Sequence, residues 1–219
     1  ARERSAIRSV IEAARRTGAR AHIVHVSDGA ALDDVRAAKA QGVRLTVETC
    51  PHYLTLDAAE VPDGAAEFKC CPPIRDAANR ELLWDGLLDG TIDAVVSDHS
   101  PSVAELKVAD FGEAWGGIAG LQTGLTAVWT AAKARGIALE TLLPLMTTGP
   151  ARIAGLAGIE GAHRGLIEIG APAHFAVFAP EEQHTVDASA LEYRNAMSPW
   201  HGQTLDGVVR ATYLHGGLA

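Results

Sequence analysis

The spacing of apolar positions changes along this chain and divides it into predicted elements. Over the first twenty residues Ile7, Val10, Ile11 and Ala14 share one side of a helix, and Gly18 ends that pattern. Short β-branched or continuous apolar runs follow, bounded by turn residues, and they predict buried strands. The predicted strands are 21–26, 43–49 and 92–96, and the predicted helices between them are 30–40 and 76–89.

The alternation of helices and strands predicts an α/β fold with a parallel sheet. In such βαβ units all strands run in one direction, so their carboxyl ends meet at one edge of the sheet. A barrel of eight units needs about 250 residues, and only three convincing strands precede the C-terminal region. The sequence therefore predicts either a fold smaller than a barrel or a part of one.

The last third of the chain has a different pattern. After further predicted helices at 121–135, 139–148 and 150–156, short β segments are expected at 165–170, 175–178 and 208–214, with a polar, loop-like stretch at 181–200. We therefore expect two parts, a barrel-like part over residues 1–160 and a small β-rich part over residues 161–219.

Composition and charge exclude several classes of protein. The chain has 219 residues, of which 47% are hydrophobic, as in a globular protein. A formal net charge of -8 argues against a nucleic-acid-binding surface. No apolar run reaches membrane-spanning length, and the first residues do not resemble a signal peptide. We expect Cys50, Cys70 and Cys71 to be reduced thiols in a cytoplasmic protein.

Two residues that can bind metal follow predicted strands. His25 ends the strand at 21–26, and Asp98 ends the strand at 92–96, so both belong to the same edge of a parallel sheet, two strands apart. A carboxylate there can bind a metal and accept a proton from water. Taken singly, an Asp after a strand more often caps a turn, and a His more often has a structural role. His22 and His25 face opposite sides of their strand.

Three loops near the carboxyl ends of the predicted strands allow both a structural and a functional interpretation. His52 follows Pro51 and either orients a metal ligand or is an ordinary loop residue. The two prolines in segment 69–75 make a stiff loop, which either presents backbone groups to a ligand or only connects elements. The glycines in segment 114–120 either let backbone approach a ligand or permit a tight turn.

Five motifs occur in order along the chain: HVS at 25–27, ETCPHYL at 48–54, KCCPPIRD at 69–76, SDHSP at 97–101 and AWGGIAGLQ at 114–122. Together they resemble the allantoinases, a family of the cyclic-amide group of the amidohydrolase superfamily, beside dihydroorotases and hydantoinases. The resemblance covers nearly the whole chain and is closest from residue 25 to residue 122. The SDHSP and AWGGIAGLQ forms favour allantoinases over their relatives.

The resemblance implies the second half of a metal-dependent (β/α)8 barrel with a small β-sandwich, and ring opening of allantoin to allantoate. It implies that His25 binds the second of two divalent metal ions, preferably zinc. Asp98 would bind the first metal and act as general acid and base. Substrate contacts would fall at Cys71 and Gly116 through main chain, with Ser100 beside the metals. A homotetramer is the oligomeric state that the resemblance implies.

The chain also departs from the family pattern. The family's His-x-His pair, its carboxylated lysine that bridges the metals and the histidine of its fifth strand would all precede residue 1. We therefore expect residues 1–219 alone to be inactive, and their unpaired strand edges to make them unstable or prone to associate. His174 also stands where relatives carry Asp. Dihydropyrimidinase, hydantoinase or dihydroorotase activity is the near alternative, and a metal-free structural or assembly protein is the distant one.

Overall fold

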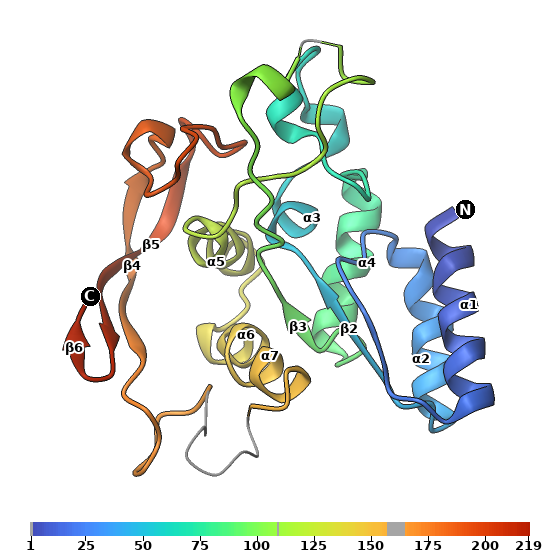
Figure 1. Ribbon diagram of the computed structural model, residues 1–219. Helices are drawn as coiled ribbons and strands as arrows, with labels where there is room; N and C mark the ends of the chain where they lie inside the picture. The colour runs from blue at the N-terminus through green and yellow to red at the C-terminus, as the bar shows by residue number, and fades with distance from the viewer. Residues whose placement is uncertain (1, 109, 157–164) are drawn as a thin grey trace.

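A three-stranded parallel sheet lies at the centre of the structure (Figure 1). The computed structural model describes residues 2–108, 110–156 and 165–219. In chain order the helices and strands are α1 Arg2–Thr17, β1 Ala21–Ile23, α2 Leu32–Ala40, β2 Leu45–Thr49, α3 Pro51–Thr55, α4 Ala77–Leu88, β3 Ala94–Val95, α5 Gly124–Ala134, α6 Leu139–Met146, α7 Thr148–Ile153, β4 Phe175–Thr185, β5 Thr204–Leu214 and β6 Gly217–Leu218.

The sheet order β1-β2-β3 is parallel throughout and confirms the predicted α/β alternation. Ala21 pairs with Leu45, and Glu48 pairs with Ala94. The regular strands β1 and β3 are shorter than expected, although Val26 and Val96 still donate backbone hydrogen bonds to β2 at 2.9 and 3.0 Å. These strands end early because His25 and Asp98 leave the extended conformation, as the site below shows.

Helices cover the sheet as the apolar spacing predicts. In Figure 1, α1 and α2 lie to one side of the sheet, and α5 to α7 lie to the other. Ile7, Ile11 and Ala14 of α1 are buried, whereas Val10, expected on the same side, is 39% exposed. Asp76 caps α4 by accepting a hydrogen bond from the Asn79 N–H at 2.9 Å. The predicted helix pattern is therefore correct to within a few residues at its ends.

The segment after β2 differs from the prediction. Pro51 was expected only to stop the strand, and it instead begins the short helix α3, where its fixed φ and missing N–H are tolerated. The helix is buried: His52, Tyr53 and Leu54 are 1%, 3% and 0% exposed. This short helix carries His52 from the end of β2 into the interior.

The C-terminal residues form one antiparallel sheet of order β4-β5-β6, seen beyond α5 in Figure 1. The expected β segment at 165–170 is wrong: these residues form turns and irregular chain, with Ile167 and Ile169 exposed, because no described strand pairs with them. The expected loop at 181–200 is partly wrong, since β4 continues to Thr185 by pairing with Thr204–Asp206 across a bulge. Among the described residues there is no second sheet to complete a sandwich.

The antiparallel sheet packs onto the α/β part through a shared core. Trp200 is 1% exposed, and its indole Nε1 donates a hydrogen bond to Thr55 Oγ1 of α3 at 3.2 Å. Val186 and Leu205 join the same buried apolar cluster as the helices. His174 lies against His215, with ring centroids 4.3 Å apart. The expected domain boundary between residues 160 and 161 lies outside the described residues and stays a prediction.

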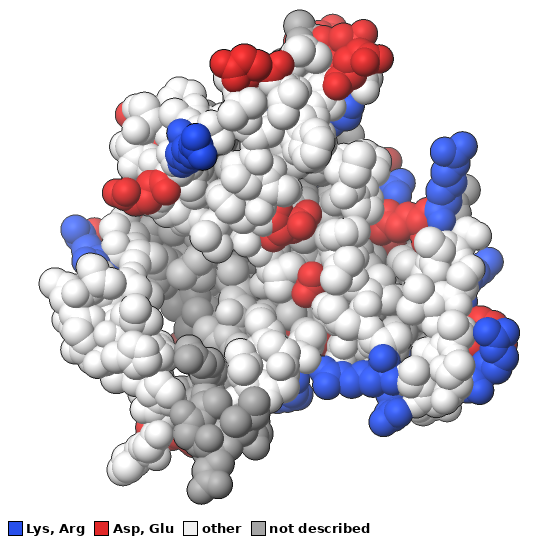
Figure 2. All heavy atoms as spheres, in the orientation of Figure 1, with Lys and Arg blue, Asp and Glu red and all other residues white. Residues whose placement is uncertain are grey.

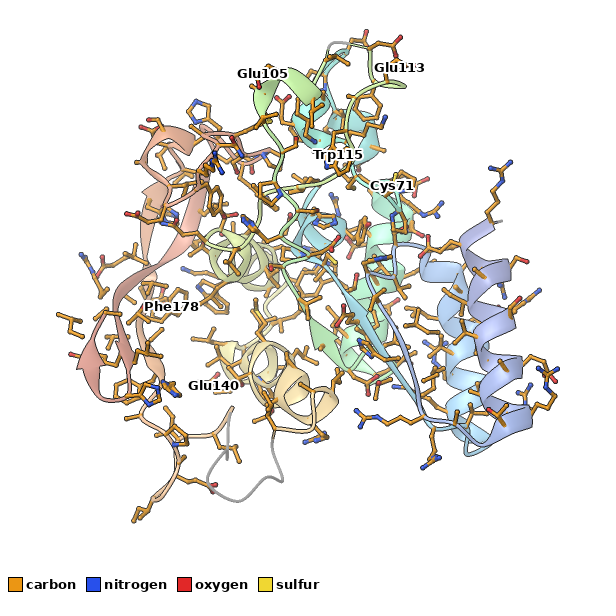
Figure 3. All side chains as sticks on the ribbon, in the orientation of Figure 1. Cys71, Glu105, Glu113, Trp115, Glu140 and Phe178 are labelled. Atoms are coloured by element: carbon orange, nitrogen blue, oxygen red, sulfur yellow. The ribbon has the colours of Figure 1, made fainter. Side chains whose placement is uncertain are left out.

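The surface charge and the free state of the cysteines are consistent with the composition of the chain. On the face shown in Figure 2, basic side chains lie toward the ends of α1 and α2, and acidic side chains gather at the opposite, upper end, where Figure 3 labels Glu105 and Glu113. Cys50, Cys70 and Cys71 are free thiols, as expected. Among the described residues, no helix has the length and apolar character needed to cross a membrane.

Candidate functional site

His25 and Asp98 both adopt a left-handed backbone conformation directly after the parallel strands. Their φ angles are 40° and 43°, and among the described residues the only other non-glycine residue with positive φ is His215. A non-glycine residue in this region costs about 1–3 kcal/mol, and such strain gathers at functional sites. The two turns direct both side chains from the carboxyl edge of the sheet, where the sequence placed them.

The charges of His25, Asp98 and His52 influence one another. Burial raises the pKa of the Asp98 carboxyl, and the nearby His25 opposes that shift. Burial, and after it the nearby His25, lower the pKa of His52 to about 3. His52 is therefore neutral across the physiological range. The structure thus places the two predicted ligands at the same edge of the sheet, within electrostatic reach of each other, with a buried neutral imidazole beside Asp98.

Asp98 also lies in a cluster with Cys50 and His52. One ligand atom from each of the three residues lies within 4.8 Å of the others. Cys50 is 0% exposed, and burial raises the pKa of its thiol well above the usual range. Neither ring nitrogen of His52 has a hydrogen-bond partner among the described residues. The sequence allowed two roles for His52, and Cys50 was not predicted as a site residue. The run Cys50-Pro51-His52 at the end of a strand could have indicated both.

This donor set fits a divalent metal ion. Imidazole nitrogen and carboxylate oxygen are ligands that zinc takes in catalytic sites. Two unpartnered nitrogens in a side chain that is 1% exposed also mark a place where a partner is needed. Cys50, His52 and Asp98 each offer one ligand atom to such an ion, and His25 lies near enough to act on the charge of Asp98.

The other predicted site residues are Ser100, Cys71 and Gly116, and contacts between neighbouring loops connect them to Asp98. The Ser100 hydroxyl donates to the Asp98 carbonyl at 3.0 Å, and the Ser100 N–H donates to the Ile118 carbonyl at 3.0 Å. A Cβ added to Gly116 would lie 3.3 Å from Cys71 Sγ, which shows how closely these two residues pack. The backbone of segment 114–120 therefore lies between the Cys71 loop and the loop that carries Asp98 and Ser100.

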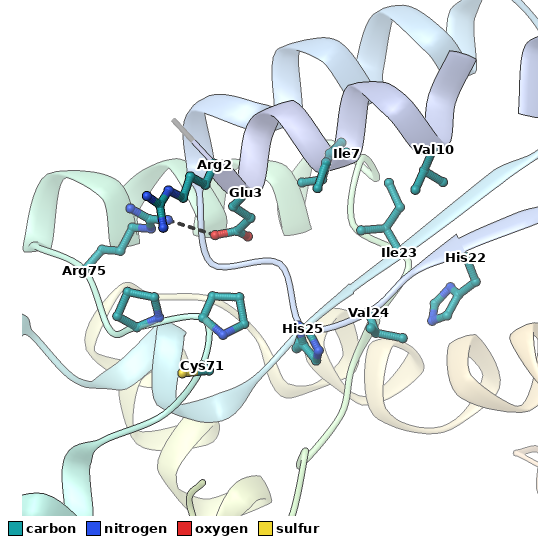
Figure 4. Close-up of a pocket in the computed structure, with 13 residues that line it drawn as sticks. Arg2, Glu3, Ile7, Val10, His22, Ile23, Val24, His25, Cys71 and Arg75 are labelled. Carbon is teal, nitrogen blue, oxygen red and sulfur yellow. Dashed lines mark hydrogen bonds and ion pairs between the residues drawn. The ribbon is translucent and has the colours of Figure 1, made fainter. Parts of the chain in front are cut away.

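A groove of about 760 Å³ opens beside β1, between α1 and the Cys71–Pro73 loop (Figure 4). His25 and Cys71 line this groove, whereas Asp98, Ser100 and Gly116 do not. Most of its surface is apolar and comes from α1 and the chain around β1, including the exposed Val10 and Val24. The groove therefore lies beside the sheet next to the candidate site, and Asp98 is not part of its lining.

An ion-pair network fixes the turn that follows His25. The Glu3 carboxylate accepts hydrogen bonds from the Ser27 N–H and hydroxyl, both at 2.7 Å, and from Arg75 at 2.8 Å. Figure 4 shows the Arg75–Glu3 pair at one end of the groove. Burial alone would raise the pKa of Glu3, but the hydrogen bonds from Ser27, Arg75 and Asp28 hold it below its usual value. The Glu3 carboxylate therefore links helix α1 to the turn after His25 and to the proline loop.

Comparison with known proteins agrees with this architecture. The chain matches the amidohydrolase family over residues 2–219. It is 56% identical to an allantoinase of Streptomyces avermitilis, over 98% of this chain and 47% of that protein. It is 40% identical to an allantoinase of Arabidopsis thaliana, over 99% of this chain and 44% of that protein.

Among solved structures, an L-hydantoinase (dihydropyrimidinase) from Arthrobacter aurescens superimposes with a TM-score of 0.91 at 26% sequence identity. That match covers 98% of this chain and 48% of the hydantoinase chain. This chain spans about half the length of the curated relatives that it matches. The match over residues 2–219 nevertheless includes every site residue discussed above, and this chain belongs to the amidohydrolase family.

Proposed function

We propose that these residues form part of the active site of a metal-dependent cyclic amidohydrolase that opens the ring of allantoin to give allantoate. The observation that carries the proposal is the pair His25 and Asp98, both held in left-handed backbone conformations at the same edge of a parallel sheet. The similarity to allantoinases at 56% and 40% identity supports this substrate over other cyclic amides.

In this proposal Asp98 and His25 each bind one of two divalent ions. Zinc is the ion that their imidazole and carboxylate ligands favour. Further ligands come from outside residues 1–219. Bound divalent ions would polarise the amide carbonyl and lower the pKa of water. Cys50 and His52, which lie beside Asp98, are buried, and burial strengthens the electrostatic interactions made among these groups.

The chain's own residues have defined tasks in ring opening. Asp98 accepts the proton of the attacking water at a carboxylate oxygen and delivers a proton to the departing ring nitrogen. The main chain at Cys71 and Gly116 is close-packed and can hydrogen-bond the planar ureide. Ser100 fixes the backbone of the Asp98 turn through the Asp98 carbonyl. Positioning of the substrate by such rigid groups supplies a large share of catalysis in general.

We also propose the finer architecture and setting that go with this function. The parallel strands are part of a (β/α)8 barrel, and the antiparallel sheet is part of a small β-sandwich. The exposed apolar residues Val177, Val209 and Leu218 on that sheet support a covering second layer. We also propose a homo-oligomer, which family resemblance makes a tetramer. We propose a cytoplasmic location, which the three free thiols support.

The experiment is hydrolysis of a panel of cyclic amides by the protein at its natural length, with metal analysis of the same sample. Allantoin, hydantoin, dihydrouracil and dihydroorotate should be compared, with the Asp98→Asn variant as the matched control. We expect allantoin to be the best substrate and divalent metal to co-purify. Faster hydrolysis of hydantoin or dihydrouracil would favour the hydantoinase alternative. A stable, metal-free protein without hydrolytic activity would favour a structural or assembly role.

A further inference from the structure

The buried imidazole of His52 has no assigned partner, although it lies beside Asp98. Its side chain is 1% exposed, and neither ring nitrogen has a hydrogen-bond partner among the described residues. We propose that His52 is a positioning residue, whose ring N–H donates a hydrogen bond to the Asp98 carboxylate and orients it when Asp98 binds metal. This inference rests on the proposed function only in taking Asp98 as a metal ligand.

The ring of His52 is held from several sides. Pro51 fixes the first position of α3, and the His52 and Tyr53 rings meet edge to face with centroids 4.2 Å apart. The Tyr53 hydroxyl in turn donates to the Pro72 carbonyl at 2.6 Å. Since the ring is packed in this way, it cannot turn toward solvent to find water as a partner.

The neighbouring donors and acceptors leave one satisfactory arrangement. A neutral imidazole has one N–H donor and one acceptor nitrogen. The Asp98 carboxylate and the Cys50 sulfur both lie within 4.8 Å of one ring nitrogen of His52. When that nitrogen carries the proton, its N–H can donate to the carboxylate, which is the strongest acceptor near it. The reverse arrangement would point an acceptor nitrogen at the carboxylate and leave the buried donor unpaired, at a cost of about 1–3 kcal/mol.

The His52 nitrogen and the Asp98 carboxylate, within 4.8 Å of each other, would approach to hydrogen-bond distance when metal binds. Hydrogen bonds in active sites are often long before the site is loaded and tighten afterwards. A carboxylate that gives one oxygen to a metal keeps the other free for such a donor. The turn at Asp98, with φ of 43°, sets the backbone, so the remaining freedom is rotation of the carboxylate itself. A donor from His52 would remove that freedom.

The test is a double-mutant cycle on zinc affinity in the protein at its natural length, stripped of metal and titrated with zinc against a chelator. His52→Leu should weaken zinc binding about 10–100-fold, as loss of partners that orient ligands does in general. In an Asp98→Asn background the same change should have little effect, because the oriented group is gone. His52→Gln, which keeps an N–H donor, should restore most of the affinity. His201→Leu, an exposed histidine in the C-terminal part, is the control and should bind zinc as the parent does.

Several outcomes would overturn the inference. Equal losses for His52→Leu in both backgrounds, or the loss of one zinc equivalent, would make His52 a ligand in its own right. A His52→Gln variant that binds zinc about 10–100-fold more weakly than the parent would remove the hydrogen bond from the explanation, and this measurement does not need a folded Leu variant. Coupling between residues 52 and 98 without hydrolysis of any cyclic amide would instead support His52 and reject the proposed substrate class.

Discussion

The Glu3 carboxylate accepts both the N–H and the hydroxyl of Ser27 at 2.7 Å, so the first turn of α1 holds the turn that follows His25. Ser27 lies only two residues after His25, whose φ of 40° strains the backbone there. Arg75 donates to the same carboxylate and to the Ser27 hydroxyl. The position of a predicted metal ligand therefore depends on a residue more than twenty positions earlier in the chain.

Glu3→Gln should lower the free energy of unfolding by about 1–3 kcal/mol, because Arg75 loses its buried carboxylate partner and one Ser27 bond loses its charged acceptor. Urea unfolding followed by circular dichroism measures this change. Glu12→Gln is the matched control, since Glu12 lies on the same helix, is 63% exposed and pairs with Arg15 one turn away. Equal effects of the two substitutions would show that the network contributes nothing beyond a surface ion pair.

Gly117→Ala should destabilise the loop that carries Ser100. A Cβ at this position would lie 2.3 Å from the Ser100 carbonyl oxygen, so backbone must move. Overpacking of this kind costs about 1–3 kcal/mol, and the movement should also displace Asp98 through the Ser100 hydroxyl. Thermal unfolding and turnover should therefore fall together. Gly217→Ala, where the added Cβ would meet its nearest atom at 3.5 Å, should change neither.

Asp98→Asn should reduce turnover of allantoin about 10²–10⁴-fold, the range over which general acid–base groups contribute. The amide has the shape of the carboxylate, and it removes a partly buried charge, so the free energy of unfolding of metal-free protein should stay the same or rise slightly. Steady-state kinetics beside urea unfolding separates the two effects. Substantial residual turnover would exclude Asp98 from proton transfer.

His25→Ala should lower the occupancy of one metal more than that of the other, because His25 is proposed to serve one ion. Metal analysis after dialysis against a weak chelator measures the stoichiometry. His22→Ala is a matched control on the same strand, where the imidazole instead contacts Glu48 and Thr46 at 3.0 and 2.9 Å. Unchanged metal content in His25→Ala would refute its role as a ligand.

The period of the apolar residues was enough to predict the parallel sheet and the common edge of His25 and Asp98. Each strand is bounded by local turn residues, and βαβ connectivity then fixes direction. The left-handed turns at both residues were not predictable, because His and Asp adopt them only when the surrounding structure demands it. The burial of His52 was also hidden, since it depends on Pro51 starting a helix rather than only ending a strand.

The C-terminal errors have a non-local cause. Residues 181–185 are polar and resemble a loop, yet they are strand because Thr204–Asp206 lies beside them. Residues 165–170 carry apolar side chains at strand-like spacing, yet no described strand lies next to them. Strand formation depends on a partner more than on the segment itself. Sequence pattern alone therefore indicates where a strand could form and leaves its pairing open.

Asp34 provides a pH-dependent test of how α1 is fixed to α2. Its carboxylate accepts hydrogen bonds from Arg4 at 2.6 Å and from Arg8 at 2.9 and 3.1 Å. These bonds lower the pKa of Asp34 from 3.8 to about 2. A carboxyl group with a lowered pKa in the folded state stabilises the fold above its unfolded pKa. That contribution is lost as the pH falls from about 4 toward about 2.

Asp34→Asn should therefore lower the free energy of unfolding near neutral pH by about 1 kcal/mol, after allowance for solvent screening of a partly exposed group. The difference from the parent protein should shrink as the pH is lowered through the range between 3.8 and about 2. Urea unfolding at a series of pH values, down to the lowest at which the parent is folded, measures it. Asp33→Asn is the control, because Asp33 is 77% exposed and pairs with Arg36 on its own helix. A difference that stays constant with pH would mean that the substitution acts through packing and not through the charge.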